Sequence, residues 1–216
     1  MYNNPIMEIE QIATIVALII SIILHEMAHG YAANALGDPT ARLQGRLSPN
    51  PLVHIDPLGS VILPALLLIS NANFFFGWAK PVPYNPYNLS NQKWGEAMVA
   101  VAGPLANIAL ALIFTCIVRF APVFELSQAF VEMARYIVYI NILLALFNLI
   151  PLPPLDGSKI LKALLPFRAA QSYQRFMHTF ESLGLFATFA LIFIFINLFW
   201  APFSMIVGSI VSILIG

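Results

Sequence analysis

Long apolar stretches, separated by shorter polar connections, make up most of the chain. They cover residues 6–36, 52–70, 95–119, 131–150 and 181–216. Because about 20 helical residues cross the hydrocarbon core of a bilayer, each stretch is a candidate membrane segment. The last stretch is 36 residues long and indicates two short helices with a break near residues 199–202. The pattern predicts an all-α polytopic membrane protein with about five to six membrane segments.

The stretch 74–91, FFFGWAKPVPYNPYNLSN, departs from this pattern because it is rich in aromatic residues, proline and asparagine. Clusters of proline and asparagine mark turns and extended chain, and aromatic residues gather where a membrane meets water. We therefore expect an extended β-hairpin at the interface. With the apolar stretch before it, this hairpin makes residues 52–94 a re-entrant element between the first and third membrane segments.

The composition supports a membrane protein. Hydrophobic residues make up 60% of the chain and charged residues 9%, whereas a soluble domain has about 45–50% apolar and about 25% charged residues. Lys+Arg and Asp+Glu both number 10, so the net charge indicates no nucleic-acid partner. The single cysteine, Cys116, excludes an intramolecular disulfide and a cysteine-rich metal site.

The first apolar segment contains three ionisable residues close together, in the sequence His25-Glu26-Met27-Ala28-His29. On a helix, residues four apart lie on the same face, so the two imidazoles can bind one zinc ion. Glu26 is rotated off that line and can act on a water molecule without ligating the metal. An ionisable side chain inside a transmembrane helix is energetically costly, and a buried metal gives a reason for three of them.

A catalytic zinc ion has three protein ligands and one open position, so a third ligand must come from another segment. The candidates are His178, His54, Asp56 and Asp156. The prolines before Asp156 cannot continue a helix, and they place Asp156 on extended chain at membrane depth, where irregular backbone lines protein or a cavity. Asp156 can equally be the N-cap of a helix that begins near Ser158, and these residues alone leave the choice open.

Three motifs of the chain resemble, in order, those of the site-2 protease family of intramembrane zinc metallopeptidases: HEMAH, AGPLAN at 102–107 and NLIPLPPLDG at 148–157. The resemblance extends from about residue 17 to residue 165. NPLVHIDPLGS and FGWAKPVPYNPYN resemble the compact bacterial branch of this family, which has no attached PDZ or CBS domain.

The resemblance implies one zinc ion held by His25, His29 and Asp156, with Glu26 as the catalytic base. It also implies that Asn148 binds substrate or stabilises the oxyanion, and we take His54 as a second candidate for that donor. The whole chain, 1–216, is then one intramembrane metalloprotease domain. Its parts are the HExxH helix 6–36, the re-entrant region 52–94, the GPxxN helix 95–119, the helix and LDG motif 131–157 and the C-terminal membrane helices 181–216.

A shared metal restricts the topology. His25 lies about 24 Å along its helix from Ile9, and Asp156 follows the end of the apolar stretch 131–150, so both lie near the C-terminal ends of their helices. The two helices must therefore run parallel, which requires an odd number of complete crossings between them. We expect residues 52–94 to turn back without a net crossing.

This topology divides the basic residues unevenly between the two sides. Two of them, Arg119 and Arg135, lie on the side of the N-terminus. Eight lie on the other side: Arg42, Arg46, Lys80, Lys93, Lys159, Lys162, Arg168 and Arg175. Because cytoplasmic loops carry an excess of Lys and Arg, we expect a multi-pass protein of the cell membrane whose active site opens towards the cytoplasm.

The sequence thus favours an intramembrane metallopeptidase. Its substrate is a membrane-embedded protein helix that unwinds locally, because a helical backbone hides its carbonyl groups, and residues 74–91 are placed to pair with the unwound strand. The alternative is a non-proteolytic membrane metalloprotein that acts as a chaperone or quality-control scaffold. Glu26 argues against it, since a structural zinc site is usually closed by four ligands and needs no such base.

Overall fold

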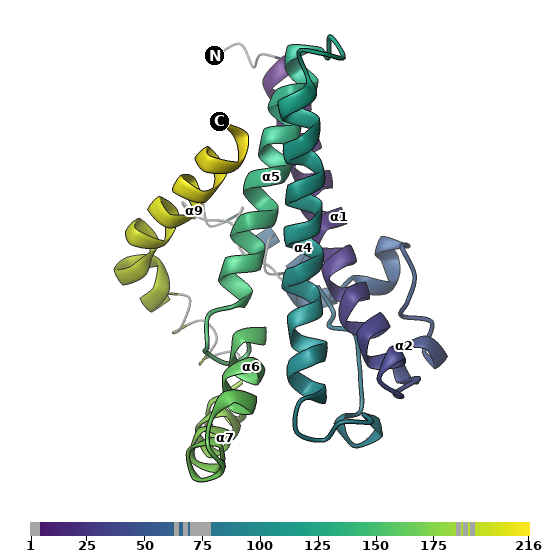
Figure 1. Cartoon of the computed structure of the whole chain (residues 1–216), viewed down its shortest axis with the longest axis vertical. Coiled ribbons are helices and arrows are strands. Elements are labelled where there is room, and N and C mark those ends of the chain that lie inside the picture. The colour runs from purple at the N-terminus through teal and green to yellow at the C-terminus, as the bar shows by residue number, and fades with distance from the viewer. Residues whose placement is uncertain are drawn as a thin grey trace.

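The structure is a computed structural model that describes residues 5–62, 65–66, 69, 79–184, 187, 190 and 193–216. Its longer helices are α1 (Pro5–Ala35), α4 (Gly95–Phe120), α5 (Gln128–Asn148), α6 (Asp156–Leu164), α7 (Phe167–Ser182) and α9 (Trp200–Ile215) (Figure 1). Its shorter helical turns are α2 (Thr40–Leu43), η1 (Pro51–His54), η2 (Pro57–Ile62), η3 (Pro86–Asn88) and η4 (Phe195–Phe199).

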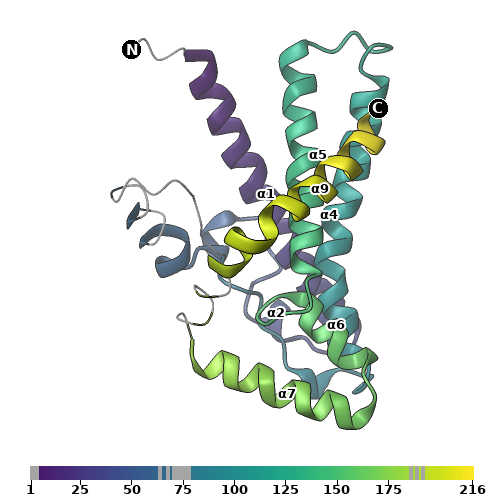
Figure 2. The same cartoon turned by 90° about the vertical axis from the view of Figure 1, so that its left-hand side faces the viewer.

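Helix α4 is the centre of the bundle and packs against both α1 and α5. Its buried positions include the small residues Ala97, Ala100 and Gly103, and small residues let helix backbones approach closely in a membrane. Figure 2 shows that α1 and α5 run in one direction and α4 in the opposite direction. The helix that carries His25 and the helix that precedes Asp156 are therefore parallel, as the sequence predicted.

Four helices among the described residues are long and apolar enough to cross a membrane: Ile15–Ala35, Gly95–Phe120, Gln128–Asn148 and Asn197–Ile215. They support an all-α, multi-pass membrane protein. The predicted count of five to six segments is not supported. The stretch 52–70 lies partly outside the described residues, and where it is described it includes the short turn η2. The stretch 181–216 also lies partly outside them, and α9 begins at Trp200, within the predicted break.

The predicted β-hairpin is not supported. The described residues contain no strand, and residues 70–78 lie outside them. From residue 79 to residue 85 the chain has no regular secondary structure. The Val82 N–H, which a hairpin would use in its own ladder, donates instead to the Glu26 carboxylate at 2.9 Å, and the prolines on either side of Val82 have no N–H to donate.

Asp38 lies just beyond the end of α1, and its carboxylate is buried. It joins the two ends of the segment that connects α1 to α4. The carboxylate accepts hydrogen bonds from both ends of this segment: from Thr40 Oγ1 (2.6 Å), the Asn85 N–H (2.7 Å) and Asn88 Nδ2 (2.8 Å). Beside it, the Ser90 N–H donates to the Leu36 carbonyl at 2.8 Å. Residues 38–90 therefore leave and return to the same end of the bundle, as the parallel arrangement requires.

Replacing Asp38 by alanine should destabilise the fold, because it leaves donors of Asn85 and Asn88 without their acceptor. Hydrogen bonds to a charged group contribute about 1.5–3 kcal/mol, and the exposed Asn85 and Asn88 can bond to water instead, so we expect the free energy of unfolding in detergent to fall by about 2 kcal/mol. Denaturant titration followed by circular dichroism measures this change. Asp38→Asn, which keeps an acceptor oxygen, should lose less, and an Asp38→Ala variant as stable as the parent would contradict the role of this carboxylate.

Candidate metal centre

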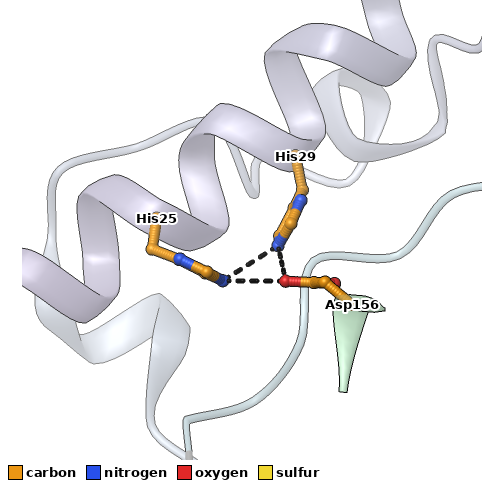
Figure 3. Close-up of side chains that lie close together, drawn as sticks. All are labelled: His25, His29 and Asp156. Carbon is orange, nitrogen blue, oxygen red and sulfur yellow. Dashed lines mark hydrogen bonds and ion pairs between the residues drawn. The ribbon is translucent and has the colours of Figure 1, made fainter. Parts of the chain in front are cut away.

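Three side chains with nitrogen and oxygen donor atoms converge beside α1 (Figure 3). His25 and His29 lie one turn apart on α1, and Asp156 is the first residue of α6. Asp156 Oδ2 lies 3.2 Å from Nε2 of each histidine, and the two Nε2 atoms are 3.0 Å apart. The donor atoms all lie within 4.8 Å of one another, which is close enough for one ion to contact all three.

A proline-rich turn between α5 and α6 delivers Asp156 to this point. Leu155 occupies the N-cap position of α6, and no side chain caps the helix. The alternative that Asp156 serves as the N-cap is therefore wrong, and its side chain is directed at the histidines instead. Gly157 lets α6 begin against the end of α5, since a Cβ there would lie 2.2 Å from the Leu149 carbonyl oxygen.

Hydrogen bonds from the far side of each imidazole fix its orientation. His25 Nδ1 donates to Asn107 Oδ1 at 2.5 Å, and His29 Nδ1 donates to the Val99 carbonyl at 2.8 Å. With the proton on Nδ1, each Nε2 presents a lone pair to the other and to the Asp156 carboxylate. Three such lone pairs at this distance repel one another unless a cation lies between them, and a protein that binds metal through histidine commonly anchors the ring in this way.

A buried chain of polar side chains extends this anchoring through the bundle. Asn107 Nδ2 donates to Asn141 Oδ1 at 2.8 Å, and Asn141 Nδ2 donates to Ser21 Oγ at 2.9 Å. Both asparagines are 0% exposed and Ser21 is 2% exposed. The chain runs from α4 through α5 to α1, so it fixes which way the Asn107 amide faces and, through it, the tautomer of His25.

Helix α4 closes over the histidines at Gly103. A Cβ at this position would lie 2.5 Å from His29 Nε2 and 2.6 Å from His25 Cε1. These distances are too short for any side chain. The glycine of the AGPLAN motif thus makes room for the two imidazoles, while the asparagine four residues later holds one of them.

Glu26 lies beside the three donors rather than among them, and its Oε2 accepts the Val82 N–H at 2.9 Å. Two residues brace the segment that supplies this N–H. The Arg46 guanidinium donates to the Lys80 carbonyl at 2.7 Å, and the His54 carbonyl accepts the Lys80 N–H at 2.8 Å. The carboxylate of Glu26 is therefore held in one orientation next to the candidate metal ligands.

The remaining candidates of the sequence analysis have other contacts. The His54 imidazole is buried, and its Nε2 lies 2.9 Å from the Ser48 carbonyl in the same loop. Asn148 Nδ2 donates to the Leu144 carbonyl at 3.0 Å within α5. His178 is exposed on α7. Of the four possible third ligands, it is thus Asp156 that the structure brings to the histidines.

Lys159 is a cation near the centre that the sequence analysis did not single out. Its Nζ lies 3.7 Å from Asp156 Oδ1 and 5.7 Å from the centre of the Tyr84 ring. Burial lowers the pKa of Lys159, but Tyr84 and Asp156 outweigh this effect and raise the pKa above its ordinary value. The ammonium group of Lys159 favours the ionised form of Asp156, which is the form that can act as a metal ligand.

The sequence analysis also missed the roles of Asn107 and Asn141. Each is an amide side chain inside a long apolar helix, and such residues usually pair with a polar group on a neighbouring helix. That signal marks both as residues with a buried partner. It does not name the partner, because the partner depends on how the helices are rotated about their axes.

Comparison with known proteins agrees with a metal centre, because the matching family and the relatives are described as peptidases or zinc metalloproteases. The model of the family described as Peptidase family M50 matches residues 13–136 and 121–195. The chain is 39% identical over 158 residues to "Putative zinc metalloprotease YwhC" of Bacillus subtilis, a match that covers 70% of this chain and 68% of that protein. It is 27% identical over 193 residues to "Putative zinc metalloprotease Rip2" of Mycobacterium tuberculosis, covering 88% of this chain and 68% of that protein.

A further relative is the Rip2 protein of Mycolicibacterium smegmatis, which is 29% identical over 147 residues. That match covers 68% of this chain but 54% of the relative, so the chain spans about half of its length. No solved structure matches the chain.

Asn107→Ala should weaken zinc binding, because it removes the acceptor that holds the His25 ring. Loss of an outer hydrogen-bond partner typically costs about 10–100-fold in metal affinity, and we expect a loss in that range. Competition against a chromophoric chelator, with metal analysis of the purified protein, measures it.

Two further variants calibrate this measurement. Asp156→Ala should lower zinc occupancy more than Asn107→Ala, and His178→Ala, at an exposed position, should leave it unchanged. Full zinc affinity in Asn107→Ala would show that the His25 ring needs no such anchor. Full occupancy in Asp156→Ala would mean that another group is the third ligand.

Proposed function

The chain belongs to peptidase family M50, the site-2 protease family of zinc metalloproteases, and on that basis we propose that it is an intramembrane zinc metalloendopeptidase. It hydrolyses peptide bonds within or near the transmembrane segments of other membrane proteins. The observation that carries the proposal is the position of Glu26, an anchored carboxylate beside three converging donor atoms in a bundle whose helices α1, α4 and α5 are apolar enough to span a bilayer.

Zinc is held by His25, His29 and Asp156. The donor set suits this ion, which takes imidazole nitrogen and carboxylate oxygen and leaves one position open at a catalytic site. The hydrogen-bonded Nδ1 atoms and the space at Gly103 support the assignment. When bound, zinc acts as a Lewis acid towards the scissile carbonyl group and towards water.

Glu26 acts as the general base. Its carboxylate takes a proton from the attacking water and later passes it to the leaving amine. Two features suit it to this role, because it stands next to the ligands without being one and the Val82 N–H holds one of its oxygens. The hydrogen bonds of Lys80 to Arg46 and to the His54 carbonyl hold the segment that supplies this N–H.

For the developing oxyanion we propose Asn148 as the first donor. It lies at the C-terminal end of α5, directly before the turn that carries Asp156. To stabilise the oxyanion, the Asn148 amide must break its hydrogen bond to the Leu144 carbonyl and donate to the substrate oxygen instead. His54 is the weaker candidate, because its Nε2 faces the Ser48 carbonyl and its backbone braces the segment before Val82.

The substrate is a membrane helix that unwinds locally to expose a scissile peptide. We propose that it pairs with the chain around residues 79–85, which lies next to Glu26 and forms no strand ladder among the described residues. Because the N–H groups of Lys80, Val82 and Asn85 already have acceptors, this segment offers a substrate mainly its carbonyl groups, and hydrogen bonds to these do not depend on substrate sequence.

The rival function is a non-proteolytic metalloprotein with a structural site. Such a site is usually closed by four ligands, whereas three ionisable side chains gather at this centre among the described residues. Glu26 would have no role in a closed site.

The metal centre faces the cytoplasm in this proposal, and residues 52–94 make no net crossing. The end of the bundle that carries α2, α6 and α7 (Figure 2) also carries most of the basic residues of the chain, and the cytoplasmic side attracts such residues.

Glu26→Gln should keep the fold and the zinc but lose cleavage of a model transmembrane substrate in proteoliposomes. General-base catalysis contributes about 10²–10⁴-fold to rate, and we expect a loss in this range. Gel analysis of the fragments, together with metal analysis, separates the two properties. Cleavage at the wild-type rate would remove Glu26 from the mechanism, and loss of zinc would mean that it is a ligand.

The proposed topology is tested with single cysteines in a Cys116→Ser background. Cysteines at Gln44, Asn88 and Ser172 should all react with a membrane-impermeant maleimide from the cytoplasmic side, and one at Ser127 from the outside. If positions 44 and 172 are labelled from opposite sides, the proposed topology fails.

A further inference from the structure

Helix α7 has one aromatic and one polar face. A helical period of 3.6 residues places four large apolar or aromatic side chains on one side: Tyr173, Phe176, Met177 and Phe180. The opposite side carries mainly polar residues, with Phe167 at the start of the helix as an exception: Arg168, Gln171, Gln174, Arg175 and His178. The rings of Tyr173 and Phe176 lie 6.1 Å apart and those of Phe176 and Phe180 lie 6.3 Å apart, so the aromatic side chains form a continuous row.

The orientation of α7 determines what the aromatic row faces. Figure 2 shows that α7 lies crosswise to α4 and α5, at the end of the bundle. The Tyr173 hydroxyl donates to the carbonyl of Pro151, which follows the end of α5, at 2.9 Å. The aromatic face is thus turned towards the ends of the spanning helices, yet Phe176 remains 47% exposed.

The two arginines of the polar face have no carboxylate partner among the described side chains. Neither Arg168 nor Arg175 forms an ion pair with a described side chain, whereas Lys159 and Lys162 of the neighbouring α6 pair with Asp156 and Glu96. Aromatic residues on one face and arginine on the other are the features of a helix that lies in the plane of a membrane surface. Arginine there can reach lipid phosphate groups, which it binds through its planar fork of donors.

We propose that α7 is an interfacial helix, whose aromatic face is inserted into the lipid of the bilayer surface and whose arginines contact lipid phosphates. The lipid that covers Phe176 belongs to the same bilayer that surrounds the spanning helices, so no protein partner is needed there. The proposal rests on the membrane placement of the chain and not on its peptidase activity, so it can fail while the proposed function stands.

Labels on the two faces of α7 test this placement. Phe176→Cys and Gln171→Cys lie about 140° apart around the helix. Each is made in the full chain with Cys116→Ser, labelled with an environment-sensitive fluorophore and reconstituted into vesicles of equal parts phosphatidylcholine and phosphatidylglycerol. Because an interfacial helix buries its apolar face about 5–10 Å deep, lipid-attached nitroxide should quench position 176 about threefold more than position 171, and aqueous iodide should show the reverse.

Phe180→Cys, on the aromatic face, repeats the test should the change at Phe176 disturb folding. Equal access of iodide to both faces would show that α7 lies in water and overturn the proposal. So would a label at position 176 that is shielded from iodide but not reached by the lipid quencher, because a protein contact, such as a second copy of the chain, would then cover this face.

Discussion

The three central helices, α1, α4 and α5, meet at one buried chain of hydrogen bonds, from Ser21 through Asn141 and Asn107 to His25. Lipid offers no partner for a polar group, and the amides of this chain bond to groups on neighbouring helices. Apolar packing alone would tolerate rotation of one helix against another. These hydrogen bonds do not tolerate such a rotation, so they fix the positions of the imidazoles.

Much of the centre is predictable from the sequence because it depends on local geometry. The four-residue spacing of His25 and His29 places both on one face of any helix, and the prolines before Asp156 require a turn there. The shared centre further requires two parallel helices, which the structure contains. The sequence does not decide whether Asp156 is a metal ligand or a helix cap, because a carboxylate at the start of a helix suits both roles, and only the family resemblance and the structure favour the ligand.

What the sequence did not predict depends on contacts between distant segments. The expected hairpin is not supported among the described residues, where the Val82 N–H donates to Glu26, which lies far away in the sequence. Asn107 and Asn141 look alike as single polar residues in apolar helices, and the sequence does not say that they bind each other. The predicted count of five to six segments is likewise not supported, since the described residues include four helices long and apolar enough to cross a membrane, and the stretches 52–70 and 181–216 lie partly outside those residues.

The order in which the ligands are synthesised has a consequence for biogenesis. The ribosome delivers His25 and His29 with the first membrane helix, whereas Asp156 follows two further spanning helices. Until then the insertion machinery handles a helix with two imidazoles and a glutamate that lack their final partners. An unfinished chain thus has the motif but not the site, so the candidate metal centre is complete only after Asp156 has been synthesised.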